Sequence, residues 1–180
     1  AAARNALFAL GWKKVHRLDV PVVSIGNLTV GGTGKTPTVI WLAETLRGMG
    51  HIPHVVSRGY GGSLDGPLKM DAALHSARET GDEALMLSRT GEAWIGADRV
   101  AAGQAMQADG VDLIIMDDGH QNPGLAKTLS LVVVDSAAGF GNKKTRPQIG
   151  TGNQLSRGTT LFIPITSGSL KQGTNMPRHW

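Results

Sequence analysis

The sequence has no cysteine, few aromatic residues and no long apolar run. The absence of cysteine among the 180 residues excludes disulfide scaffolds, zinc–thiolate centres, iron–sulfur clusters and cysteine nucleophiles. Aromatic residues make up only 4% of the chain. The mixture of basic and aromatic side chains that is typical of nucleic-acid binding is therefore missing, and we expect no nucleic-acid partner. No apolar run reaches the roughly 18 residues that would indicate a membrane-spanning helix.

Acidic residues are also missing from one end of the chain. The formal net charge is +4, but residues 1–142 contain 12 Lys and Arg against 14 Asp and Glu. Residues 143–180 contain six Lys and Arg and no acidic residue. The positive charge therefore belongs to this last part and does not by itself predict a nucleic-acid partner. Only Leu161–Ile165 has the character of a strand there, so we expect 143–180 to be a divergent, poorly ordered basic tail.

Short apolar segments that alternate with helical segments predict an α/β fold. Strands are expected over residues 20–25, 52–57, 93–95, 111–116 and 129–134, and helices over 35–49, 82–89 and 98–109. Because parallel strands are joined by right-handed crossovers, these strands should form a parallel sheet flanked by helices. We expect this domain to span residues 20–142. The preceding residues 1–19 are expected to be part of an amphipathic segment, because apolar residues are followed there by basic ones.

A glycine-rich segment lies between the first expected strand and the first expected helix. Its central residues are Gly31-Gly32-Thr33-Gly34-Lys35-Thr36. Glycines let the backbone curl so that several N–H groups converge on a phosphate, and the helix adds its positive dipole end. Lys35 would contact the phosphates and Thr36 would bind Mg²⁺. The usual pattern has glycine where this sequence has Thr29, so we interpret the segment as a variant P-loop and the fold as P-loop NTPase-like.

Two pairs of adjacent carboxylates lie where a metal-bound nucleotide would need them. Asp117 and Asp118 follow an expected strand, and a strand end beside a P-loop usually supplies the carboxylate for the metal. The alternative for this pair is turn formation, because Asp-Gly sequences favour turns. Asp82 and Glu83 open an expected helix, where Asp82 could be the N-cap, or the pair could serve as metal ligand and base. Spacing alone leaves both interpretations of the second pair open.

Polar residues follow other expected strands at the same edge. The segment Arg58-Gly59-Tyr60-Gly61-Gly62 could bind phosphate through its arginine and pack on a sugar or base through its tyrosine, and an ordinary loop is equally compatible with it. The segment His120-Gln121-Asn122, directly after the aspartate pair, could hydrogen-bond hydroxyl groups of a substrate. Three histidines without a metal-like grouping are expected at the surface: His51, His54 and His75.

Five segments together resemble one enzyme family. In chain order they are VPVVSIGNLTVGGTGKTP (20–37), SRGYGG (57–62), GDE (81–83), DDGHQN (117–122) and GFGN (139–142). In this order, and with the threonine of the variant P-loop, they resemble the tetraacyldisaccharide 4′-kinases, the lipid A kinases of Gram-negative bacteria. The resemblance implies an enzyme that transfers the γ-phosphate of ATP to the 4′-hydroxyl of tetraacyldisaccharide 1-phosphate, giving lipid IVA.

The resemblance also implies a role for each matching residue. The phosphate-binding residues would be Thr29, Val30, Gly31, Gly32, Thr33, Gly34, Lys35 and Thr36. The ligands of Mg²⁺ would be Thr36, Glu83 and Asp118. The catalytic residues would be Asp82, Lys35 and Asp117, and the residues around the substrate would be Tyr60, Arg99, Gln121 and Asn122. The asparagine at position 122 is a departure, because the family often has histidine there.

The resemblance also has implications for cofactors, partners and location. The resemblance implies ATP and Mg²⁺ as cofactors, a lipid A disaccharide precursor as substrate, and a cytoplasmic monomer bound peripherally to the inner membrane of a Gram-negative bacterium. The match ends after Asn142, where Lys143-Lys144-Thr145-Arg146 replaces the family's continuation, and the family's C-terminal domain with its histidine is missing. We therefore expect a partial kinase, either a fragment or a chain whose 3′ end is read out of frame. Two alternatives stay open: a truncated nucleotide-binding fragment without kinase activity, and a P-loop regulatory ATPase.

Overall fold

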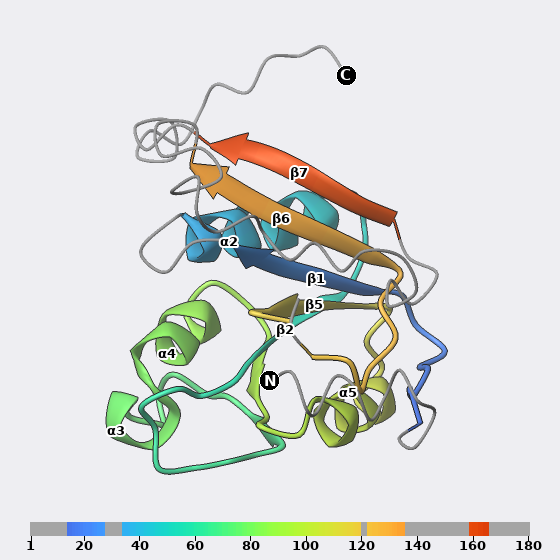
Figure 1. Ribbon diagram of the computed structural model, residues 1–180. Coiled ribbons are helices and arrows are strands. Elements are labelled where there is room, and N and C mark those ends of the chain that lie inside the picture. The colour runs from blue at the N-terminus through green and yellow to red at the C-terminus, as the bar shows by residue number, and fades with distance from the viewer. Residues whose placement is uncertain (1–13, 28–33, 120–121, 136–158, 166–180) are drawn as a thin grey trace, which may run out of the picture.

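A sheet of seven strands forms the centre of the structure (Figure 1). The computed structural model describes residues 14–27, 34–119, 122–135 and 159–165. The strands are β1 (Val22–Asn27), β2 (Pro53–Ser57), β3 (Leu68–Lys69), β4 (Ala93–Ile95), β5 (Leu113–Asp117), β6 (Leu129–Asp135) and β7 (Thr159–Ile165). Their order across the sheet is β3-β4-β2-β5-β1-β6-β7. All neighbouring strands are parallel except β3, which runs antiparallel to β4. The predicted α/β class is confirmed.

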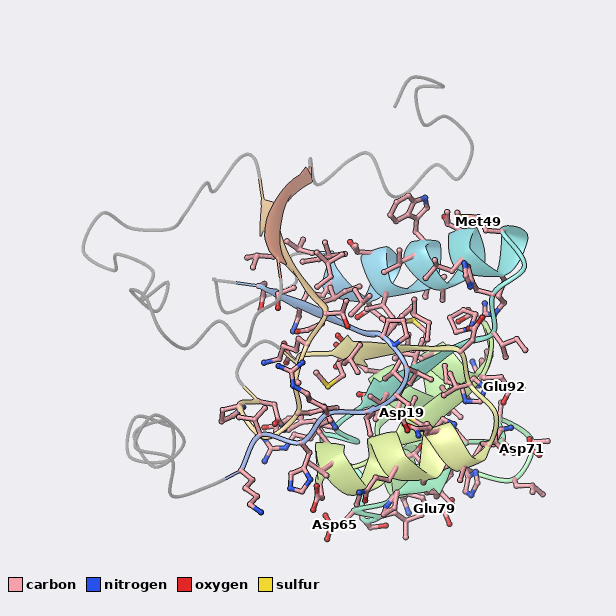
Figure 2. The ribbon with its side chains drawn as sticks, turned by 90° about the vertical axis from the view of Figure 1, so that its right-hand side faces the viewer. Asp19, Met49, Asp65, Asp71, Glu79 and Glu92 are labelled. Carbon is pink, nitrogen blue, oxygen red and sulfur yellow. The ribbon has the colours of Figure 1, made fainter. Side chains whose placement is uncertain are left out.

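The helices of the described residues cover both faces of this sheet. They are α2 (Lys35–Gly48), α3 (Ala77–Thr80), α4 (Asp82–Ser88) and α5 (Arg99–Ala108). On one face Val39 of α2 and Leu87 of α4 share a buried cluster with Ile25 of β1. On the other face Met106 of α5 is buried with Ile114 of β5. Figure 2 shows α2 (light blue) and α5 (yellow-green) on opposite sides of the strands, so the described part of the chain has three layers.

The central strand β1 explains why the sequence there is a continuous apolar run. Its side chains alternate between the faces, because Val23 packs in the cluster with α2 and Val22 in the cluster with α5. A parallel strand that is covered on both faces needs apolar residues at successive positions. Pairing then aligns the strand ends, since Ile25 of β1 is in register with Asp117 of β5.

Local backbone chemistry sets where the two longest helices begin. Gly34 lies at the N-cap of α2 with φ 75°, a left-handed conformation that glycine adopts without a steric penalty. Pro37 lies in the first turn of α2, where its missing N–H leaves no hydrogen bond unmade. At α5 the carboxylate of Asp98 accepts hydrogen bonds from the N–H groups of Val100 and Ala101, which is the expected role of aspartate at an N-cap.

Predicted and observed boundaries differ by at most two residues for the strands and helices predicted within 20–142. The short elements β3 and α3 were not predicted. The strand expected at Leu161–Ile165 is found as part of β7, which is in register with β6 from Thr159 to Ile165. The other residues of 143–180 lie outside the described residues, and the boundaries at 19 and 142 stay predictions.

The first described residues run beside the segment that precedes β6. The N–H of His16 donates to the carbonyl of Gly124, and the N–H of Ala126 donates to the carbonyl of His16, both at 2.8 Å. The remainder of the expected amphipathic segment lies outside the described residues. Within the described part of the chain, no helix combines the length and the apolar character that crossing a membrane requires.

Candidate active site

The predicted motifs meet at the carboxyl edge of the sheet. Strand β1 leads toward the N-terminus of α2, β2 ends at Ser57 before the Tyr60 loop, and β5 ends at Asp117. Register pairs Ile25 with Asp117 and Val56 with Met116, so the three strand ends are neighbours. In open parallel sheets, ligands bind outside this edge. The fold therefore brings the three motifs into one candidate site.

An ion pair joins the P-loop lysine to the aspartate pair. The Nζ atom of Lys35 lies 2.5 Å from Oδ1 of Asp118. The Lys35 side chain is 17% exposed and the Asp118 side chain 63% exposed, so the pair lies at the surface of the edge. Water weakens ion pairs in such a position, so a more highly charged ligand can replace either partner.

The backbone after β5 turns sharply at this ion pair. Asp118 has φ 55°, a left-handed conformation that aspartate tolerates better than most residues. The following Gly119 fits closely, because a Cβ atom there would lie 2.6 Å from Cβ of Met116 and 3.0 Å from Oγ of Ser24. The turn is thus fixed by the strands beneath it. Asp118-Gly119 therefore forms the predicted turn, and Asp118 also forms the ion pair with Lys35.

The oxygen atoms near the start of α2 suit a hard cation. The hydroxyl of Thr36 lies 3.5 Å from Oε1 of Glu83, at the limit of a hydrogen bond. Thr36 is buried and Glu83 is exposed in the first turn of α4. Hydroxyl and carboxylate oxygens are the ligands that Mg²⁺ prefers. Asp117, which is buried near them, has a carboxylate oxygen (Oδ1) without a hydrogen-bond partner among the described residues. The donor set therefore fits a magnesium ion.

Asp117 is the most strongly perturbed acid of the edge. Its side chain lies in a residue that is only 3% exposed. The pKa of Asp117 is raised from 3.8 to about 6, chiefly by burial; Lys35 and Arg99 lower it, and Glu83 and Asp118 raise it. A carboxylate with such a pKa takes up a proton or a cation readily near neutral pH.

The GDE segment is held against the Tyr60 loop. Gly81 has φ 86°, and a Cβ atom there would lie 2.4 Å from the carbonyl oxygen of Tyr60. The N–H of Leu64 also donates to the carbonyl of Glu79 at 2.9 Å. Gly81, rather than Asp82, is the N-cap of α4. The N-cap interpretation of Asp82 is therefore wrong, because the contact with the Tyr60 loop demands glycine at the cap. Asp82 is exposed as the first helical residue of α4.

Two of the residues expected around the substrate have contrasting environments. Tyr60 is 87% exposed at the edge. Arg99 is only 5% exposed, and its guanidinium donates to the carbonyls of Ser57, Gly96 and Asp117. Burial lowers the pKa of Arg99 to about 10, with Asp117 opposing the shift, so this arginine stays protonated at neutral pH.

A pocket of about 650 Å³ adjoins the aspartate turn on the α5 side of the sheet. Its polar lining includes Lys14, His16, Gln104 and Asn122, together with Asp98 and Arg99 at the start of α5. Asn122 closes the turn, since its N–H donates to the carbonyl of Gly119 at 3.0 Å. Asn122 Oδ1 accepts from the N–H of Gly124 at 2.9 Å.

Two functional candidates had no local signal in the sequence. Ser24 is buried in β1 with its hydroxyl unpaired among the described residues. Lys127 is half-buried, donates to the carbonyl of Asn122 at 2.7 Å, and has its pKa lowered to about 8 by burial. Seven candidate site residues lie outside the described residues: Thr29, Val30, Gly31, Gly32, Thr33, His120 and Gln121.

A second charged cluster lies at the opposite edge of the sheet. His54, at the start of β2, is buried, so the expectation that it lies at the surface is wrong. The indole N–H of Trp94 donates to its Nδ1 at 3.1 Å, and burial lowers the pKa of His54. Glu92 and Asp109 lie close enough to form a metal-binding group with it. The ammonium of Lys69 already bonds both carboxylates, at 2.9 and 2.7 Å, so their charge is compensated without a metal.

The chain is similar to one group of kinases over most of its length. The family model for tetraacyldisaccharide-1-P 4′-kinase matches residues 1–151, a range that begins before and ends after 20–142. The tetraacyldisaccharide 4′-kinase of Dinoroseobacter shibae is 52% identical over 132 residues, which are 73% of this chain and 39% of that protein. The tetraacyldisaccharide 4′-kinase of Rhodospirillum rubrum is 47% identical over 166 residues, covering 91% of this chain and 50% of that protein.

A solved structure is similar as well. The LpxK of Aquifex aeolicus, crystallised in complex with ATP, has a TM-score of 0.67 and 31% identity, covering 76% of this chain and 45% of that one. The chain thus spans half or less of the length of these relatives. With its fold, its P-loop helix and a family match over residues 1–151, this chain belongs to the tetraacyldisaccharide-1-P 4′-kinase family.

Proposed function

We propose that this chain binds Mg·ATP and transfers the γ-phosphate to the 4′-hydroxyl of tetraacyldisaccharide 1-phosphate, the reaction named by its family. The observation that carries the proposal is the meeting of Lys35 and Thr36 at the start of α2 with the carboxylates of Asp118 and Glu83. Phosphoryl transfer depends mainly on positioning and on neutralising charge, and these groups are suited to both.

Each group has a distinct task in this proposal. Lys35 would leave Asp118 and place its ammonium on the phosphate oxygens. Thr36, Glu83 and Asp118 would hold Mg²⁺, which supplies charge neutralisation on the phosphate oxygens when bound. Asp117, buried behind them, would contribute negative charge without contacting water. The residues from Thr29 to Thr33 would surround the phosphates with backbone N–H groups.

The acceptor requires a base and a binding surface. Asp82 is exposed in the first turn of α4 and lies beside Glu83, so it is suited to accept the proton of the 4′-hydroxyl. The pocket beside Asn122 has amide, carboxylate and cationic groups in its lining, which is the chemistry that a sugar with several hydroxyls and a phosphate needs. Tyr60 and Gln121 would complete this surface.

The location follows from the acceptor in the same proposal. A lipid acceptor requires the chain to work at a membrane surface, which we propose is the cytoplasmic face of the inner membrane, reached as a monomer. Val15 is exposed between Lys14 and His16, a combination that favours contact with anionic headgroups. Co-sedimentation with vesicles of phosphatidylglycerol tests this, and phosphatidylcholine vesicles are the control.

Phosphate transfer from labelled ATP to the detergent-solubilised disaccharide tests the central proposal. We expect labelled lipid with the unaltered chain, none with Lys35→Ala, and unchanged labelling with Arg89→Ala, an exposed control outside the site. ATP binding without transfer would instead establish the alternative of a nucleotide-binding fragment. ATP hydrolysis without lipid labelling would favour a regulatory ATPase, and no ATP binding would refute the P-loop assignment.

A further inference from the structure

We propose that Arg99 is a positioning residue, whose buried guanidinium holds the carboxyl ends of β2, β4 and β5 in one arrangement rather than binding the acceptor. The consequence for nucleotide binding rests on the proposed function. The role of Arg99 in holding the strand ends does not rest on the proposed function. The positioning role and the proposed kinase function can therefore be refuted separately.

The guanidinium contacts three separate strand ends. Its Nη1 atom donates to the carbonyl of Ser57, the last residue of β2, at 2.9 Å, and to the carbonyl of Gly96, directly after β4. Its Nη2 atom donates to the carbonyl of Asp117, the last residue of β5, at 3.2 Å. Strand ends leave carbonyls without ladder partners, and a buried carbonyl without a partner is costly. The carbonyl of Ser57 also accepts from the N–H of Gly96 at 3.1 Å, so the guanidinium is a second donor there. One planar side chain thus bonds the three carbonyls together.

Each of these carbonyls leads directly into a different segment of the edge. Ser57 precedes the loop that contains Tyr60 and packs on Gly81. Gly96 precedes the capped start of α5. Asp117 precedes Asp118, which holds Lys35 at 2.5 Å. A shift of the guanidinium would therefore displace the Tyr60 loop and the aspartate turn relative to each other.

The same contacts argue against acceptor binding by Arg99. The residue is only 5% exposed, and its Nη atoms donate to main-chain carbonyls although it lies in the wall of the pocket. Gln104 and Lys14 line that pocket as well and are exposed, so they are better placed to meet a ligand. A lysine would keep the charge, but it lacks the rigid fork that reaches three carbonyls at once.

The test compares Arg99→Lys with Arg89→Lys, a matched change at an exposed arginine. Hydrogen exchange of the ligand-free chain should show faster exchange at 57–62, 96–98 and 117–119 in Arg99→Lys, with α2 and β1 unchanged. Mg·ATP titration of the folded variant should show an affinity lower by about tenfold or more, the usual effect of removing a supporting contact. Arg89→Lys should match the unaltered chain in both measurements.

Several outcomes would overturn this role for Arg99. Unchanged exchange and unchanged Mg·ATP affinity, with weaker binding of the disaccharide phosphate alone, would make Arg99 an acceptor ligand. Faster exchange throughout the chain would make it a general stabilising residue. If the unaltered chain binds no Mg·ATP, the proposed function fails while the exchange experiment still decides the positioning role. If Arg99→Lys does not fold, Arg99→Ala with millimolar guanidinium replaces it, and a failure of guanidinium to restore exchange protection at the three strand ends counts against the proposal.

Discussion

Replacing Asp117 with asparagine should stabilise the chain at neutral pH and weaken its site. The carboxylate is buried at the end of β5, and Oδ1 has no hydrogen-bond partner among the described residues. Asparagine has nearly the same shape but no charge to desolvate. The change therefore measures how much a buried charge at this position lowers the free energy of unfolding.

The magnitude follows from the pKa of Asp117. Its value of about 6 in the folded chain lies above the ordinary 3.8, so the folded state keeps its proton to a higher pH than the unfolded state. The free energy of unfolding must then fall as the pH rises from about 4 to about 6, and the full cost is present above pH 6. At 1.36 kcal/mol per pKa unit this cost is about 3 kcal/mol. We expect Asp117→Asn to recover about 1–3 kcal/mol at pH 7.5, because the new amide also needs partners.

Urea denaturation followed by far-UV circular dichroism at pH 7.5 and pH 4 measures this effect. The gain in Asp117→Asn should be largely absent at pH 4, where Asp117 is already protonated in the folded chain. Asp112→Asn is the matched control, and it should lower the free energy of unfolding at pH 7.5. Burial raises the pKa of Asp112, but the hydrogen bonds from His51 and from the N–H of Ile52 outweigh burial, so the pKa is lowered. A destabilised Asp117→Asn at pH 7.5, or an equal gain at both pH values, would refute the reasoning. Mg·ATP affinity should fall in the same variant.

Three further changes test other features of the edge. Ser24→Ala should raise the free energy of unfolding by up to about 1 kcal/mol in urea denaturation, because it removes a buried hydroxyl that has no partner among the described residues. Gly81→Ala should lower it by about 1–3 kcal/mol, since φ is 86° and the new methyl would clash with the carbonyl of Tyr60. The stability of the unaltered chain should rise from pH 8 to pH 10.5, because burial holds the pKa of Lys127 at about 8 in the folded state. Lys127→Met should remove that rise. If the urea midpoints of Lys127→Met and of the unaltered chain depend on pH in the same way, this prediction is wrong.

Local sequence patterns predicted the helices and strands of the core well. The helix at 35–49 is observed as Lys35–Gly48, and the strand at 93–95 is observed without change. These elements follow from glycine, proline and apolar spacing, which act over a few residues. The position of the aspartate pair at a strand end was predictable for the same reason, because Asp117 directly follows an apolar β-branched run and its partner strand leads to the P-loop.

Long-range contacts account for the predictions that failed. Asp82 has the chemistry of an N-cap, but the carbonyl of Tyr60 lies where only glycine fits, so Gly81 takes the cap. His54 is polar and lies at a strand start, but the indole of Trp94 covers and hydrogen-bonds it. The expected place of Arg99 around the substrate follows from the family resemblance and stays a prediction, whereas its buried carbonyl contacts depend on three strand ends meeting. Of these partners, only Gly96 is close in sequence to the residue that it contacts.

The unfavourable features of the described chain gather where the site is proposed. A buried carboxylate with a raised pKa, an aspartate in the left-handed region and unpaired buried oxygens at Asp117 and Ser24 all lie at the carboxyl edge of β1 and β5. At the opposite edge, Lys69 compensates Glu92 and Asp109, and His54 is hydrogen-bonded. The exposed carboxylates near His54 are therefore compensated by Lys69, whereas the buried carboxylate of Asp117 keeps an oxygen without a partner among the described residues. A bound cation and phosphates would supply at the carboxyl edge what Lys69 supplies at the other, so ligand binding and folding stability should be linked through Asp117.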